Sequence, residues 1–181
     1  MSYNRRKEMR RLLMFGILLT GVLSFSISEA VQTKLVVRAK SKDAKFIGTK
    51  MGGARVVVKD SETGKVLAEG LTTGDTGDTN KIMNEPKTRF GKIADGAAMF
   101  ETSIDIAEPM LITIDVEAPY MDKTNMIKSS TQMWLIPGKD VVGEGVTIEV
   151  PGFSVIAQSP EEVKLTDNRA AIPINAQIVM I

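Results

Sequence analysis

The sequence predicts an all-β protein: a single β-sandwich of seven to nine mostly antiparallel strands, preceded by a signal peptide. Three observations favour this fold class. Apolar and polar residues alternate with a period of two in several segments after residue 30. Glycine and proline separate these segments, and no long segment has the 3.6-residue period of a helix. The residues after position 30 are also numerous enough for one two-layer core.

Residues 1–30 have the three parts of a signal peptide. A basic stretch precedes an apolar run at residues 12–25, and a triplet with small outer residues ends at Ala30. The apolar run is shorter than the roughly 20 residues that a membrane-spanning helix needs. We therefore expect cleavage after Ala30 and a mature β-sandwich domain of residues 31–181 that is periplasmic or secreted. The alternative is an uncleaved signal anchor.

The charge of the chain changes once the leader is set aside. The whole chain has 23 Lys and Arg and 22 Asp and Glu, of which residues 1–30 hold five and two. Residues 31–181 therefore carry 18 basic and 20 acidic side chains, a net charge of −2. This balance gives no electrostatic attraction to nucleic acid or to anionic lipid. We expect a protein partner or self-association, no nucleic acid, and no stable membrane span after cleavage.

The chain contains no histidine and no cysteine. Their absence excludes Ser–His and Cys–His catalytic pairs, and it excludes zinc, copper or haem sites that need these ligands. Carboxylate acid–base chemistry, a Ser–Lys pair and oxygen ligation of calcium stay open. We expect a protein that is not an enzyme and that has no cofactor, with calcium as the one ion to consider.

Strand patterns run through the predicted domain. Residues 34–40 and 54–59 alternate, and residues 60–64 have the acidic, hydroxyl and glycine side chains of a turn, so residues 53–71 predict a hairpin. In residues 110–117 the even-numbered side chains are apolar and should face the core, while the odd-numbered ones should face solvent. Further strands are expected at residues 81–83, 97–106, 132–136, 146–150, 153–157, 162–165 and 171–181.

The C-terminus is apolar at residues 178–181. An exposed apolar strand would promote aggregation. We therefore expect these residues to be buried in the sheet, or to be completed by a neighbouring subunit through strand addition.

Residues 54–70 resemble the opening hairpin of the carboxypeptidase-regulatory-like and transthyretin-like β-sandwich domains. Asp60, Thr63, Gly64 and Thr72 match the Asp-x-x-Thr-Gly turn and the later threonine of those domains, and residues 95–100 are similar to the start of their next strand. The resemblance covers roughly residues 33–118. The insertion at residues 70–95 and everything after Tyr120 depart from the pattern, which leaves the strand order open. The resemblance implies a binding, spacer or structural module without catalytic activity.

Asp75, Asp78 and Asn80 are the candidate metal ligands. They offer hard oxygen atoms at short spacing, which calcium favours. They do not match the twelve-residue calcium loop, which needs alternating ligands and a terminal Glu. The simpler interpretation is a solvent-exposed turn in which Asp and Asn bond the backbone.

Four carboxylates lie on neighbouring predicted strands: Glu101, Asp105, Asp115 and Glu117. Paired carboxylates hydrolyse glycosidic bonds when burial keeps one of them protonated. These four fall on the faces expected to meet water, so we interpret them as part of a solvated sheet surface.

Trp134 and Tyr120 are the candidate binding residues, because aromatic side chains and nearby methionines form adhesive patches. For Trp134 we favour a place in the core, since it sits in an apolar run. The sequence as a whole predicts a non-enzymatic extracytoplasmic β-sandwich that binds or scaffolds a partner. The alternatives are a secreted structural subunit of an envelope or extracellular assembly with strand-mediated contacts, and a carboxylate-based hydrolase.

Overall fold

The computed structural model describes residues 29–121, 123 and 126–180, so almost all of the predicted leader lies outside the described residues. This part of the chain has nine strands and two short helical turns. They are β1 (Val31–Ser41), η1 (Thr49–Met51), β2 (Arg55–Asp60), β3 (Val66–Leu71), η2 (Asn80–Asn84), β4 (Phe100–Ile106), β5 (Met110–Ala118), β6 (Ile127–Leu135), β7 (Val141–Val150), β8 (Phe153–Gln158) and β9 (Asn175–Met180). Within the described ranges, no helix is long and apolar enough to cross a membrane.

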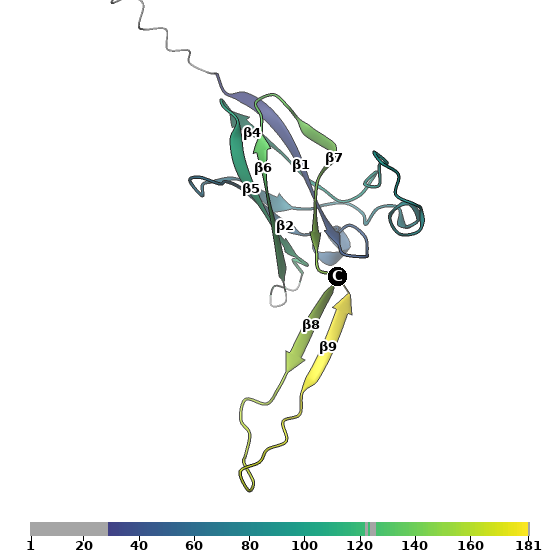
Figure 1. Cartoon of the computed structure of the whole chain (residues 1–181), viewed down its shortest axis with the longest axis vertical. Coiled ribbons are helices and arrows are strands. Elements are labelled where there is room, and N and C mark those ends of the chain that lie inside the picture. The colour runs from purple at the N-terminus through teal and green to yellow at the C-terminus, as the bar shows by residue number, and fades with distance from the viewer. Residues whose placement is uncertain (1–28, 122, 124–125, 181) are drawn as a thin grey trace, which may run out of the picture.

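Seven of the strands form two sheets that pack face to face (Figure 1). One sheet has the order β4-β1-β7 and the other has the order β3-β2-β5-β6. Every pairing in them is antiparallel except that of β1 with β7, which is parallel. The predicted all-β sandwich class is therefore confirmed.

The core lies between the two sheets and follows the predicted alternation. The inward side chains of β1, β2 and β5 are fully buried, as is Ala54 just before β2, and they include Leu35, Val37, Ala39, Val56, Val58, Ile112, Ile114 and Val116. Because side chains of a strand alternate between faces, each of these runs contributes every second residue to the core. The odd-numbered residues of β5 lie on the outer face, as predicted.

The outer face of β1 is also buried, which the alternation did not predict. Val36, Arg38 and Lys40 are only 3%, 6% and 7% exposed. β1 is the middle strand of its sheet, and the segment at residues 91–98 folds over it. A central strand with a loop across its outer face is shielded on both sides, so its polar residues must find partners there.

The predicted hairpin at residues 53–71 is confirmed by the antiparallel pairing of β2 with β3. In its turn the Asp60 carboxylate accepts hydrogen bonds from the Thr63 hydroxyl and from the N–H groups of Glu62 and Thr63. These bonds, the Thr63 hydroxyl first, hold the pKa of Asp60 below its usual value. Gly64 closes the turn with a φ of 71°.

Two glycines of this hairpin separate the destabilisation that comes from a positive φ from the destabilisation that comes from close packing. Gly53 and Gly64 have φ values of 77° and 71°, but a Cβ on Gly53 would lie 2.5 Å from the Thr72 carbonyl oxygen, whereas one on Gly64 would meet nothing within 4 Å. We expect Gly64→Ala to lower the free energy of unfolding by about 1–2 kcal/mol through backbone strain alone. Gly53→Ala should lower the free energy of unfolding by clearly more, because the clash adds to the strain. Equal losses for the two variants in urea unfolding would contradict this explanation.

The segment between β3 and β4 is mostly loop, as predicted, but the prediction of a short strand at residues 81–83 is wrong. Residues Asn80–Asn84 form a single π-helical turn instead. The Asp78 carboxylate accepts hydrogen bonds from the N–H groups of Asn80 and Lys81 and so satisfies the start of this turn. Ile82 anchors the turn in a small second core with Phe46, Ala94 and Ala97.

The C-terminal part of the chain leaves the sandwich (Figure 1). Among the described residues, β8 and β9 pair with each other and with no third strand. The expectation that residues 178–181 are buried in the sheet is wrong for Ile178 and Met180, which are 67% and 64% exposed, and Ile181 lies outside the described residues. Pro151 and Gly152 interrupt the chain directly after β7, and the strand after them cannot continue its ladder. We refer to residues 153–180 as the arm.

Candidate functional site

The arm has one wholly apolar face. In the β8–β9 ladder Phe153 lies opposite Met180, Val155 opposite Ile178, and Ala157 opposite Ala176. Directly opposed residues of an antiparallel pair project from the same side of the ladder, and so do residues two apart on one strand. These six side chains therefore share one face, which we call the arm face.

The arm face is open to solvent. Phe153, Val155, Ile178 and Met180 are between 58% and 67% exposed. The opposite face is mixed, since Gln177 and Asn175 of β9 lie there together with the half-buried Ile156 of β8. Contiguous exposed apolar surface in a protein marks a site of interaction with another surface, and a lone two-stranded hairpin is marginally stable in water. The arm therefore combines an exposed apolar face with open strand edges, the two features that a docking surface needs.

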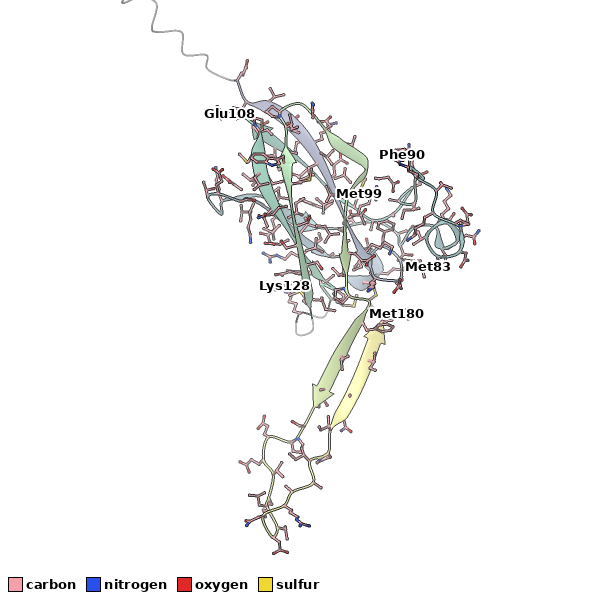
Figure 2. The ribbon with its side chains drawn as sticks, viewed as in Figure 1. Met83, Phe90, Met99, Glu108, Lys128 and Met180 are labelled. Carbon is pink, nitrogen blue, oxygen red and sulfur yellow. The ribbon has the colours of Figure 1, made fainter. Side chains whose placement is uncertain are left out.

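The arm face continues onto the base of the sandwich. A pocket of about 440 Å³ lies there and is lined mainly by Phe46, Ile47, Met51, Met83 and Met180. Figure 2 labels Met180 at the junction of arm and sandwich and Met83, in the turn η2, beside it. Because Met180 belongs both to the arm face and to the pocket, the two form one apolar surface.

The outer part of the arm, residues 159–174, is an exposed loop that carries further apolar side chains. Thr166 and Arg169 tighten its tip through two hydrogen bonds between their backbones. Val163, Leu165, Ile172 and Ile174 are all exposed, Leu165 to 71%. The short strand expected at residues 162–165 does not form. The sequence showed the apolar content of this region but not that it stands apart from the core.

The candidate calcium ligands are engaged in local structure. Asp78 bonds the backbone of the turn at Asn80–Asn84, and the Asn80 side chain bonds those of Asn84 and Glu85. Asp75 lies in a bridge with Ala97. Across the described ranges, no three or more His, Cys, Asp or Glu side chains are grouped closely enough to hold a metal ion. This arrangement favours the turn interpretation, and weak or absent calcium binding at these residues stays a prediction.

Trp134 is not in the core, so that expectation is wrong: it is 59% exposed. Alternation explains this, because Leu135 faces inward and is fully buried, which turns its neighbour outward. Trp134 lines a cavity of about 430 Å³ with Asp60, Glu62, Glu108 and Pro109, among other residues. Figure 2 labels Glu108 at the end of the sandwich far from the arm.

Tyr120 does not share a surface with Trp134. Trp134 pairs with Leu111 near the start of β5, whereas Tyr120 comes after the end of β5, beyond the pair of Ala118 with Ile127. The two aromatic residues therefore lie at opposite ends of their sheet. Tyr120 is half-buried, and Lys123 lies over its ring at 5.0 Å. A binding role for either residue stays a prediction, and a joint patch is not formed.

The carboxylates of β5 pair with cations on neighbouring strands. Lys59 Nζ lies 2.7 Å from Asp115 Oδ2, and Glu117 bonds both Lys128 Nζ at 2.6 Å and Arg55 at 3.1 Å. The Lys59 hydrogen bond lowers the pKa of Asp115, and the Lys128 hydrogen bond lowers that of Glu117. Glycoside hydrolysis needs one carboxyl of raised pKa, which is the opposite shift.

The remaining two candidate carboxylates lie in the other sheet. Glu101 and Asp105 are on β4, which pairs with β1, and both are exposed. The four carboxylates therefore do not gather into one group. The geometry favours the interpretation of a solvated, ion-paired sheet surface.

No family model, no curated protein and no solved structure matches this chain. The resemblance to carboxypeptidase-regulatory-like and transthyretin-like domains therefore stays a prediction that rests on the residues quoted for it. One of these, Thr72, is buried, where its hydroxyl donates to the Ile47 carbonyl and accepts from the Ala54 N–H. Thr72 therefore ties the segment before β2 to the end of β3.

The ion pairs of β5 predict how stability depends on pH. A carboxylate whose pKa is lower in the folded state stabilises that state above its unfolded pKa, and this contribution is lost as pH falls. For Asp115 and Glu117 the loss should run from about pH 5 downward, through the unfolded values near 3.9 and 4.3. We expect about 1 kcal/mol in total, because the pairs are partly exposed. Urea unfolding of an Asp115→Asn, Glu117→Gln variant should show a flatter profile below pH 5, and an unchanged slope would contradict the assignment.

Proposed function

We propose that this chain is an exported, non-enzymatic structural subunit that docks onto protein in the envelope or outside the cell through its arm. Of the functions that the sequence left open, this is the secreted subunit with strand-mediated contacts. One observation carries the proposal: the arm projects from a complete sandwich and presents an apolar face that stays exposed.

The energetics support docking. Burial of a large apolar side chain stabilises a complex by roughly 1.5–3 kcal/mol. The arm face offers four such side chains, Phe153, Val155, Ile178 and Met180. The open edges of β8 and β9 add unpaired backbone groups that a partner strand can use.

The layout of the domain supports the same role. Val31 begins β1 at one end of the sandwich, and the arm leaves from the other end (Figure 1). The arm therefore leaves the sandwich at the end opposite Val31, the residue at which the predicted leader joins the domain. The paired carboxylates of β5 supply ion pairs for the sheet surface, which agrees with a role in support rather than in catalysis.

The experiment compares two full-length variants in cells that produce the protein. Val155→Lys with Ile178→Lys places charge on the arm face, whereas Asn175→Lys with Gln177→Lys places the same charge on the opposite face. Native electrophoresis of extracts should show that the first variant is lost from large complexes and that the control is retained. Both should keep the melting temperature of the unmodified protein. Complexes of unchanged size in the first variant would refute the proposal, as would loss of its folded domain.

A further inference from the structure

We infer that the partner of the arm face is the same face of a second copy, packed antiparallel about a twofold axis that passes near Val155 and Ile178. The inference rests on the proposed function and identifies the partner within it. The side chains of the arm face are graded in size, and this gradient indicates how two copies would pack.

The gradient runs along the length of the arm. The pair nearest the sandwich is Phe153 with Met180, the middle pair is Val155 with Ile178, and the outer pair is Ala157 with Ala176. The face is therefore thick at the base, intermediate in the middle and thin toward the tip. Well-packed layers set large side chains against small ones across the interface.

An antiparallel pair of arms meets this condition at every level. The large pair of one copy lies over the alanines of the other, and the middle pair lies over its own equivalent on the axis. The combined thickness is then the same along the interface, so two sheets can pack at their usual spacing of about 10 Å. A parallel pair would set Phe153 against the bulky base of its partner and leave the four alanines around a void.

The arm face alone is too small for a stable interface. Six residues on each of two strands cover about 20 Å by 10 Å, or about 200 Å², which is far below the roughly 800 Å² per partner of a stable complex. Antiparallel packing lays the outer loop of each arm, residues 159–174, against the base of the partner. Leu165, Ile172 and Ile174 can then cover the apolar pocket around Met51 and Met83.

The arm face and the outer loop of each arm then lie in the interface. The six residues of the arm face and the 16 of residues 159–174 make 22, which fits the 20–30 residues that each side of a stable interface contributes. A twofold contact of this kind is closed, since each copy uses the same surface. The product is a dimer with two sandwiches at the ends and a four-stranded apolar layer between them.

Thiol cross-linking tests the pairing, and the chain suits it because it contains no cysteine. The full chain is given single cysteines at positions 153, 155, 157 or 177 and treated with a cross-linker that spans about 8 Å, which fits facing side chains of packed sheets. Val155→Cys should form a dimer by itself. Gln177→Cys, on the opposite face, is the matched control and should not.

The other two variants establish the direction. Phe153→Cys and Ala157→Cys should each stay uncross-linked alone, because equivalent positions are then about 14 Å apart along the strands. A mixture of the two should cross-link, since residue 153 of one copy faces residue 157 of the other. Dimers of Phe153→Cys alone would overturn the antiparallel arrangement.

Equilibrium sedimentation gives an independent measure. Val155→Lys should raise the dimer dissociation constant by about ten- to a hundredfold, and Gln177→Lys should change it little. A chain that is monomeric at all concentrations would overturn the dimer. If the Val155→Cys chain were monomeric and cross-linked to a different protein in cells, the second copy would be overturned while the proposed docking function stood. Cross-links to no protein at all would overturn both.

Discussion

Replacement of Arg38 by methionine is expected to lower the free energy of unfolding by about 3–5 kcal/mol, since hydrogen bonds to a charged group contribute about 1.5–3 kcal/mol each when buried. The Arg38 guanidinium bonds the carbonyl oxygens of Ala97 and Ala98, and also those of Gly143 and Glu144. These acceptors come from two segments that have no strand in common. Methionine keeps the apolar stem but leaves the carbonyls of Ala97 and Ala98 buried without a donor.

The Arg38 prediction has a graded control. Arg38→Lys retains the charge but replaces the planar guanidinium by a single ammonium group. It should therefore recover only part of the lost free energy of unfolding. Hydrogen exchange should quicken first in residues 91–98, because these residues are held over β1 by the guanidinium. Unfolding in urea gives the free energies, and a Met variant as stable as the original would show that solvent replaces the lost donor.

Truncation of Ile114 to alanine is the second large effect, with an expected loss of about 2–5 kcal/mol for removal of a fully buried aliphatic side chain. Ile114 is 0% exposed and lies on β5, between Val58 of β2 and Thr131 of β6. The surrounding core cannot collapse into the space because both flanking strands are fixed by their ladders. A loss of this size is a large part of the roughly 5–15 kcal/mol that stabilises a typical domain.

The same chemical change on the arm is the matched control. Ile178→Ala removes an identical group from a position that is 67% exposed, so the melting temperature of the sandwich should hardly change. Ile114→Val should give an intermediate loss of about 0.5–1.5 kcal/mol. Thermal and urea unfolding of the three variants check the order, and equal effects of the two alanine substitutions would contradict the separation of arm and core.

Alternation predicted the inner faces of β1, β2 and β5 because a period of two leaves no choice of face once one residue is assigned. It also had the information to place Trp134 outside, since its neighbour Leu135 occupies the core. An apolar run does not show which of its residues face inward, and the structure shows that the alternation decides.

Non-local features could not be predicted in the same way. The burial of Arg38 depends on the loop at residues 91–98 and on Gly143, which are far along the chain. The separate position of the arm depends on where β7 ends relative to the sheet. The alternating sequence pattern of a strand is the same whether the strand pairs within an isolated hairpin or within a sheet of the sandwich. Pro151 and Gly152 were visible as a break, but a break leaves open whether the next strand rejoins the same sheet.

The parallel pairing of β1 with β7 has a mechanical consequence. β1 begins at Val31, next to the leader, and β7 ends at Val150, next to the arm. The two strands run side by side in the same direction, with residues 37–41 in register with residues 146–150. Tension between the two ends of the domain pulls these neighbours in opposite directions along their own axes. Their hydrogen bonds are then strained all together instead of opening one after another, so we expect the domain to resist extension along the line that joins Val31 to the arm.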